Sequence, residues 1–301
     1  MASAHVTRTT TSLAAGALVL NALIWGVSWW PFRQLQSHGL HPLWATALMY
    51  LMIVAGLLAV HVKAWRGVAE HPQLWLLGLV AGMTNIGFNW AVTVGDVVRV
   101  VLLFYLMPAW SVLVAWWMLD EKPTPASLLR LGLAMAGVLV VLKTPDSPWP
   151  VPQGAADWLA IAGGFSFAVT NCLLRKCGNT PSGARMLVMF GGSGALAAMA
   201  ALLGMQWQLV PGPSLQAAGI PVLLALALAF MVSNVALQYG AARLAAGTTA
   251  IVMLTEILFA SVSSAVLGAA EFTPRILLGG SLIVLAAALA AMAPSAEKVA
   301  N

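Results

Sequence analysis

The sequence predicts an all-α polytopic membrane protein whose ten transmembrane helices form two inverted five-helix repeats. Of the 301 residues, 61% are hydrophobic and 8% are charged, whereas about a quarter of an ordinary soluble protein is charged. The apolar runs are continuous and about 20 residues long, as a membrane-spanning helix requires, and they lack the short alternating segments of a β-barrel. A motif of the first half also returns, in weaker form, in the second half.

The internal repeat relates residues 89–125 to residues 234–274. The matched residues are Asn89 with Asn234, Gly95 with Gly240 and, once a short gap is allowed, Glu121 with Glu271. Two related halves with an odd number of spans each must be inverted relative to one another. Secondary transporters use this plan and place the substrate site near mid-membrane between the halves.

Proline and glycine breakers divide the chain into the expected spans. The first run follows a polar tail but lacks an A-x-A-like cleavage site, so we interpret it as a retained helix. We expect a first repeat over residues 13–143, a second over residues 155–293, and polar tails at 1–12 and 294–301. The spans are 13–35, 43–62, 73–93, 98–118, 126–143, 155–174, 185–204, 216–238, 246–268 and 274–293.

Lysine and arginine are distributed unequally between the two sides of the bilayer. The larger group is Arg8, Lys63, Arg66, Lys122, Arg130, Arg175, Lys176, Arg185, Arg243 and Lys298, and the smaller is Arg33, Arg99, Lys143 and Arg275. The positive-inside rule then predicts that both termini are cytoplasmic, in a bacterial-type inner membrane. Because these cations stand singly in short loops, we expect no nucleic-acid partner. The expected partners are the lipid bilayer and a small-molecule substrate, and we expect a monomer or weak dimer.

Glu256 is the most informative single residue, because it falls midway along the ninth expected span. An ionisable group there costs about 2.5–3.5 kcal/mol, so it must face protein or water. Thr255, Phe259 and Ser263 share its helical stripe. Glu256 could be the partner of a substrate amine or a proton-coupling site, or it could be a protonated carboxyl bonded to a neighbouring helix.

Amide and aromatic residues recur at helical spacing on other spans. Amides can both donate and accept hydrogen bonds, as a zwitterionic substrate requires, although they also bond helices to one another. Most tryptophans lie near span ends and are typical interfacial anchors. The remaining candidates are Asn21, Trp25, Ser28, Trp29 and Phe32 on the first span, Asn85, Asn89 and Trp90 on the third, Trp110 on the fourth, and Asn234 with Gln238 on the eighth.

Enzyme chemistry has little support in the sequence. There is no HExxH and no Walker loop, and Gly164-Phe-Ser166-Phe-Ala168 lies in an apolar span where a nucleophile elbow cannot form. Cys172 and Cys177 are five residues apart, which is neither a redox pair nor a metal-ligand spacing. We interpret them as apolar fillers or free thiols, and we expect no catalytic residue, metal or cofactor.

Several short motifs together resemble the drug/metabolite transporter superfamily in its ten-helix EamA branch. They are Leu23-Ile24-Trp25-Gly26, Asn89, Tyr105-Leu106-Met107-Pro108, Asp120-Glu121-Lys122-Pro123, Gly132, Glu271-Phe272-Thr273-Pro274 and Gly279-Gly280. Tyr-Leu-x-Pro is also similar to the aromatic amino acid exporters of the YddG type. The resemblance implies efflux from the cytoplasm through a cavity lined by both halves, with the fifth and tenth helices at the periphery. One departure is that Leu258 stands where the second half would match Pro108.

The function expected from these observations is a secondary transporter that exports aromatic or large neutral amino acids and related metabolites by alternating access. The expected cavity residues are Trp25, Ser28, Trp29, Asn85, Asn89, Tyr105, Trp110, Gln238, Glu256 and Phe259, with Glu256 as a possible coupling site. The alternatives are an exporter of drugs, sugars or nucleotide-linked compounds, a channel or lipid scrambler, and a structural membrane subunit. A nucleotide would require several buried cations, and no span carries one at its middle.

Overall fold

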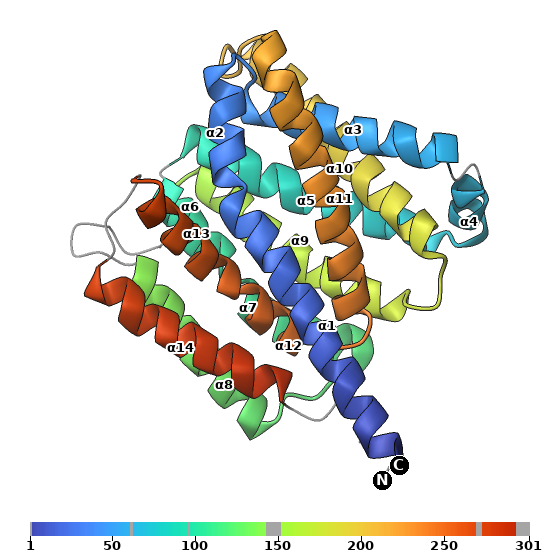
Figure 1. The fold of residues 1–301 in the computed structure, drawn as a ribbon, viewed down its shortest axis with the longest axis vertical. Helices are drawn as coiled ribbons and strands as arrows, with labels where there is room; N and C mark the ends of the chain where they lie inside the picture. The colour runs from blue at the N-terminus through green and yellow to red at the C-terminus, as the bar shows by residue number, and fades with distance from the viewer. Residues whose placement is uncertain (1, 61–62, 96, 143–151, 269–272, 293–301) are drawn as a thin grey trace.

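The computed structural model describes residues 2–60, 63–95, 97–142, 152–268 and 273–292, and these residues form helices without any strand (Figure 1). Glu271 and Lys143 lie outside the described residues. The helices are α1 (Ala2–Val27), α2 (Trp29–Ser37), α3 (Pro42–Val60), α4 (Ala64–Glu70), α5 (Gln73–Val94), α6 (Val97–Phe104), α7 (Met107–Leu119), α8 (Pro125–Leu142), α9 (Ala155–Lys176), α10 (Ser182–Gln206), the 3-10 turn η1 (Ala217–Gly219), α11 (Ile220–Ala241), α12 (Ala246–Met253), α13 (Thr255–Val266) and α14 (Pro274–Ala291).

Within the described residues, nine helical segments are long and apolar enough to cross a membrane. They coincide, to within a few residues, with nine of the expected spans. The expected third span is α5, which has 22 residues but is less apolar because Thr84, Asn85 and Asn89 interrupt it. It packs between α9 and α10, so its polar side chains face protein. The all-helical, multi-pass membrane fold is thus confirmed.

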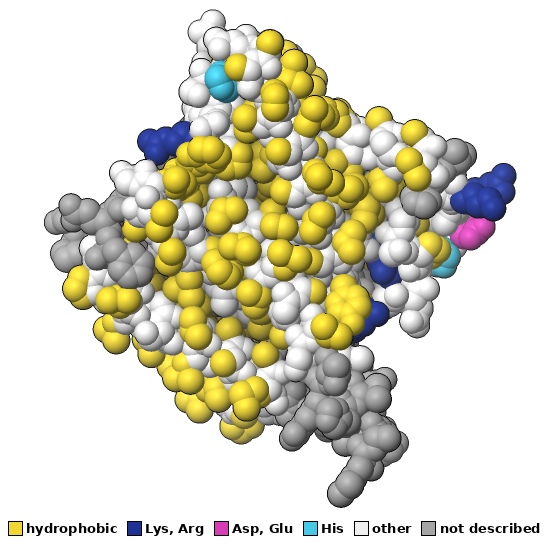
Figure 2. Space-filling model, in the orientation of Figure 1, with side chains coloured by type: hydrophobic (Ala, Val, Ile, Leu, Met, Phe, Trp, Pro, Cys, Tyr) yellow, Lys and Arg dark blue, Asp and Glu magenta, His cyan; other side chains and the backbone are white. Residues whose placement is uncertain are grey.

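The outward faces are apolar, as a bilayer requires. Large apolar side chains such as Trp117, 81% exposed, and Leu129, 72% exposed, project from the helices. Figure 2 shows hydrophobic side chains over most of one face, with the visible Lys and Arg at its margins. A soluble protein rarely exposes so large an apolar surface.

The fourth and ninth spans are each broken at a corresponding place. The fourth divides at Tyr105-Leu106 into α6 and α7, of 8 and 13 residues, and the ninth divides at Leu254 into α12 and α13, of 8 and 12 residues. Pro108, in the first turn of α7, has no N–H to donate to the preceding turn. The ninth span has no proline there and tightens instead, since the Leu254 N–H bonds the Ile251 carbonyl oxygen at 3.2 Å.

The pairs of packed helices also follow a two-fold pattern. α5 packs on α9 and α10, and its counterpart five spans later, α11, packs on α1 and α3. The equivalent helices α3 and α10 contact each other, as do α8 and α14, which lie together along one edge of the molecule (Figure 1). This is the packing expected of two inverted repeats, whose boundaries stay a prediction.

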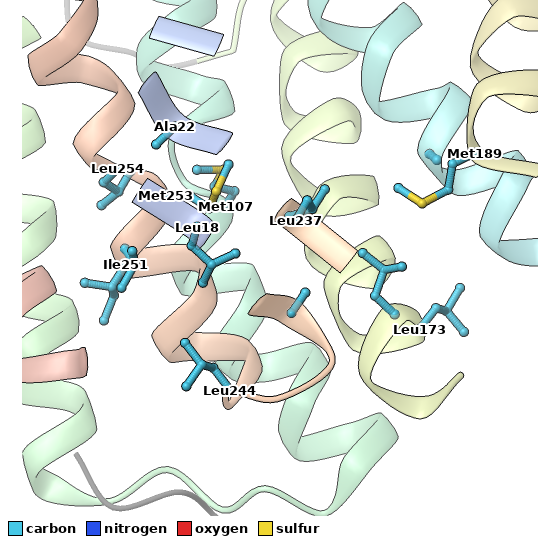
Figure 3. Close-up of a cluster of buried hydrophobic side chains, with 14 of the residues drawn as sticks. Leu18, Ala22, Met107, Leu173, Met189, Leu237, Leu244, Ile251, Met253 and Leu254 are labelled. Carbon is cyan, nitrogen blue, oxygen red and sulfur yellow. The ribbon is translucent and has the colours of Figure 1, made fainter. Parts of the chain in front are cut away.

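A hydrophobic cluster joins the two halves (Figure 3). Leu18 of α1, Met107 of α7 and Met253 of α12 gather with Leu237 of α11. Leu173 and Met189 extend the cluster to α9 and α10. All are at most 7% exposed, so burial of their side chains contributes to holding the helices of both halves together.

The closest helix contact generates a prediction for stability. A Cβ added at Gly192 of α10 would overlap the carbonyl oxygen of Gly78 on α5, whereas one added at Gly191 would find its nearest neighbour, Val54 Cγ2, 4.0 Å away. We expect Gly192→Ala to destabilise the fold by about 1–3 kcal/mol, as overpacking does, and Gly191→Ala to have little effect. Thermal unfolding midpoints in detergent measure both, and equal midpoints would contradict the close approach of α5 and α10.

Candidate functional site

A cavity lies between helices of both halves. Its volume is about 90 Å³, below the range of about 300–1,000 Å³ usual for small-molecule sites. Its lining comes from α1, α3, α5, α6, α7, α9, α10, α11, α12 and α13 together with Tyr105 at the break between α6 and α7. The neighbouring helices α8 and α14 contribute none of the lining residues of the described chain.

Aromatic side chains form two groups in the cavity wall. In the first group Trp25 meets Phe230 edge to face at 4.6 Å between ring centroids, and Tyr50 lies 6.0 Å from Phe230. In the second group Phe104 lies 4.9 Å from Phe88 and 6.4 Å from Phe167. Such pairs are rigid apolar surfaces that can hold an aromatic or large aliphatic group.

Amide side chains of the cavity bond neighbouring helices together. Asn21 Nδ2 of α1 donates to the Ser233 carbonyl oxygen of α11 at 2.9 Å. Asn85 Nδ2 of α5 donates to Ser193 Oγ of α10 at 3.0 Å, and Asn89 Nδ2 donates to Thr46 Oγ1 of α3 at 3.1 Å. The buried Asn21 Oδ1 has no hydrogen-bond partner among the described residues.

Glu256 lies in the first turn of α13, directly after the break in the ninth span, and is partly buried. The Tyr105 side chain, at the matching turn in the fourth span, lies close to the Glu256 carboxylate. Helix α1 approaches this point closely, because a Cβ added at Gly26 would lie 2.6 Å from the Glu256 carbonyl oxygen. Among the lining residues of the described chain, Glu256 is the one acidic side chain, and no Lys or Arg lines the cavity.

Half of the expected site residues line this cavity, namely Trp25, Asn85, Asn89, Tyr105 and Glu256. The other five lie apart from it. Trp29 Nε1 donates to Ser263 Oγ at 2.9 Å, and Ser28 Oγ donates to the Trp25 carbonyl oxygen at 2.7 Å. The Trp110 ring packs on the Phe165 ring, with 5.8 Å between centroids, and Phe259 packs on the hydrophobic cluster. Gln238 belongs to a buried hydrogen-bond network. The role of each in binding stays a prediction.

The buried network centres on Arg185, in the first turn of α10 and 7% exposed. Its Nη1 donates to the carbonyl oxygens of the turn between α9 and α10, and its Nε donates to Gln238 Oε1 at 3.0 Å. Gln238 Nε2 then donates to Oδ1 of the cavity residue Asn234 at 2.6 Å. Sequence reasoning counted Arg185 only as one loop cation among many, and nothing in its neighbourhood in the sequence marks it as buried.

An ion pair joins the two halves outside the spans. Arg175 Nε, at the end of α9, lies 2.9 Å from Glu121 Oε1, in the connection between α7 and α8. Burial raises the pKa of Glu121, while Arg175 and the Ala246 N–H, which bonds to it, act in the opposite direction. Ala246 is the first residue of α12, so the first-half carboxylate meets two helices of the second half.

Comparisons with known proteins agree with this architecture. Residues 12–143 match the EamA-like transporter family. Over 162 residues the chain is 24% identical to Protein RarD of Streptomyces exfoliatus, a match that covers 51% of this chain and 48% of that protein. A solved crystal structure shares the fold, with a TM-score of 0.76 at 18% identity, over 93% of this chain and 96% of the other.

Residues 12–143 are therefore similar to EamA-like transporters. The family match favours a small-molecule transporter over an enzyme. The chain spans about half the length of the curated relative that it matches. The narrower likeness to aromatic amino acid exporters stays a prediction.

The Arg185 network generates a second prediction. Arg185→Met leaves the Gly178 and Thr180 carbonyl oxygens and Gln238 Oε1 without the Arg185 donor, and each buried unsatisfied group costs about 1–3 kcal/mol. We expect a clear fall in the thermal unfolding midpoint in detergent. The matched control is Arg243→Met, because Arg243 is exposed and its side chain meets Tyr239 on its own helix turn, through a hydrogen bond to the carbonyl oxygen and a cation–π contact with the ring. Equal midpoints would show that the network adds nothing to stability.

Proposed function

We propose that this chain is a secondary transporter that exports aromatic or large neutral amino acids and related metabolites by alternating access. The observation that supports it best is the composition of the cavity. One carboxylate and several amides lie beside two groups of aromatic rings, with no basic side chain among the lining residues described. This combination suits an amphipathic solute with an amino group.

The amino group of the substrate would bind at the acceptors of the cavity. The Glu256 carboxylate has several lone pairs that can accept hydrogen bonds, and the buried Asn21 Oδ1, which has no partner among the described residues, would be a second acceptor once the cavity opens to it. A primary ammonium has three donors. Charge-assisted hydrogen bonds to a carboxylate are the strongest of these contacts.

The carboxylate end of an amino acid would bind at a donor that is poorly used in the structure. Asn234 Nδ2 has Met189 Sδ as its partner at 3.7 Å, and a thioether sulfur is a weak acceptor. A substrate carboxylate oxygen would be a stronger partner for this amide. The apolar side chain would then lie against the rings of Phe104 and Phe230 and their neighbours.

Transport would follow from relative movement of the two halves. The turns at Tyr105-Leu106 and Leu254 fall beside the cavity, and irregular points in helices near the substrate site are usual in secondary transporters. No covalent step is required. With both termini in the cytoplasm of a bacterial-type inner membrane, the direction proposed is outward.

Two other functions give different kinetics. An exporter of drugs or other metabolites would use the same cavity with a different solute. A channel or lipid scrambler would show conductance or lipid flip without counterflow. Nucleotide-linked substrates fit less well, because the described lining offers no cation for a phosphate.

Counterflow of radiolabelled phenylalanine, leucine and methionine in proteoliposomes tests the proposal. We expect saturable counterflow, reduced at least tenfold by Glu256→Gln, as follows if the carboxylate gives about 1.4 kcal/mol more to binding than the amide does. Glu70→Gln is the matched control, because Glu70 is exposed at the end of α4. Glutamate is the control solute, since its second carboxylate would meet no cation in the cavity.

Three outcomes can be distinguished. Saturable counterflow of the apolar amino acids that is lost in Glu256→Gln alone supports both the substrate class and the site. Counterflow that persists in Glu256→Gln supports the assigned substrate class but contradicts the assigned role of Glu256 in binding. A preparation that is monodisperse and exchanges no amino acid contradicts the amino acid assignment.

A further inference from the structure

Three buried polar side chains outside the cavity have no role in the proposed function. Ser111 of α7, Asn171 of α9 and Thr249 of α12 are each 0% exposed. Within the part of the chain that the structure describes, Ser111 Oγ, Thr249 Oγ1 and both polar atoms of the Asn171 amide have no hydrogen-bond partner. Buried polar groups are rarely left in this state, and each costs free energy in the conformation described.

Each of these side chains lies one helical turn from the cavity wall. Met107, Phe167 and Met253 line the cavity, on the same three helices. Each lies four positions away from one of the three polar residues, and residues four apart share a helix face. Ser111, Asn171 and Thr249 therefore lie one turn beyond the lining residues Met107, Phe167 and Met253. We call these three residues the polar layer.

The three helices of the polar layer pack against one another. α7 contacts α9 and α12, and α9 contacts α12. Val114, Ala115, Ala168, Cys172 and Ala246 form a small buried cluster between them. Asn171 precedes Cys172 directly, and Thr249 lies three positions after Ala246 on its helix. Small side chains thus close the space next to the polar layer.

The Glu121–Arg175 ion pair lies one turn further out. Arg175 follows Asn171 by four positions on α9, and Glu121 accepts from the Ala246 N–H at the start of α12. The ion pair is between Arg175 Nε and Glu121 Oε1, and among the described residues neither Glu121 Oε1 nor the buried Arg175 Nη1 has a hydrogen-bond partner. It lacks the two parallel bonds of a bidentate pair, so it is a contact that can part and reform.

We propose that Ser111, Asn171 and Thr249 line the half of the transport path that is closed in this structure, and that they bind the polar head of the substrate as it passes. Glu121 and Arg175 form the gate of this half. The proposal rests on the proposed function. When α7 parts from α9 and α12, the unpartnered groups of the polar layer gain water or substrate as partners. That gain offsets the ion pair lost at the gate.

The chain carries its own reporter of gate opening. It has two cysteines, and Cys172, 0% exposed, stands beside Asn171. In a Cys177→Ser background, we expect Glu121→Gln to speed alkylation of Cys172 by N-ethylmaleimide in proteoliposomes about fivefold, the factor that about 1 kcal/mol corresponds to. Arg175→Gln should act in the same direction.

The matched control for the gate is Asp120→Asn. This variant makes the same charge change one position earlier, at an exposed residue. The backbone φ of Asp120 is 54°, a conformation that asparagine also tolerates. Alkylation that is equally slow in Asp120→Asn and Glu121→Gln would overturn the gate. Faster alkylation in Glu121→Gln with no counterflow of any amino acid would support the gate and contradict the amino acid assignment.

A variant of the polar layer separates a transport role from a structural one. Asn171→Leu removes two unpartnered polar atoms, so we expect a thermal midpoint equal to or above that of the wild type together with counterflow reduced at least fivefold. Asn179→Leu, at an exposed turn residue, is the control. Unchanged counterflow in a stable Asn171→Leu protein would overturn the proposal that this layer lies on the path.

Discussion

The close approach of Tyr105 to Glu256 is the contact on which the arrangement of the cavity depends. A carboxylate within a membrane span must face protein or water, and here it meets a hydroxyl from the other half of the chain. Both groups lie at breaks in their spans. The contact therefore brings the two interrupted spans together, and the amides and aromatic rings of the neighbouring helices surround the space beside it.

Close packing of glycines makes this arrangement possible without a large polar interior. Gly26 lets α1 approach the start of α13, and Gly192 lets α10 approach α5. Membrane helices associate through such small residues, because lipid offers no hydrophobic drive between apolar faces. The helices that line the cavity are thus held together by close packing of their backbones and by a few amide hydrogen bonds. Helices α8 and α14 pack together at the edge of the molecule.

The sequence predicted the helical fold and nine spans well because apolar runs of membrane length are the strongest signal a sequence carries. Glu256, Asn85 and Asn89 could be found in advance, since a polar residue in an apolar run must face inward. Ser28 and Trp29 share a helical stripe with Trp25, but the chain breaks at Ser28 and turns them away from the cavity wall. Arg185 and the polar layer could not be predicted, because their burial depends on which helices meet in space.

If a water-accessible cavity lies between the two halves, a cysteine placed at Asn85 should be accessible to reagents in the water phase. In a Cys172→Ala, Cys177→Ser background, Asn85→Cys should react with a membrane-impermeant thiosulfonate, and phenylalanine should slow the reaction. Leu224→Cys, on an exposed face of α11, should stay unreactive because it faces lipid. If Asn85→Cys reacted no faster than Leu224→Cys, with no effect of any amino acid, the claim would be contradicted.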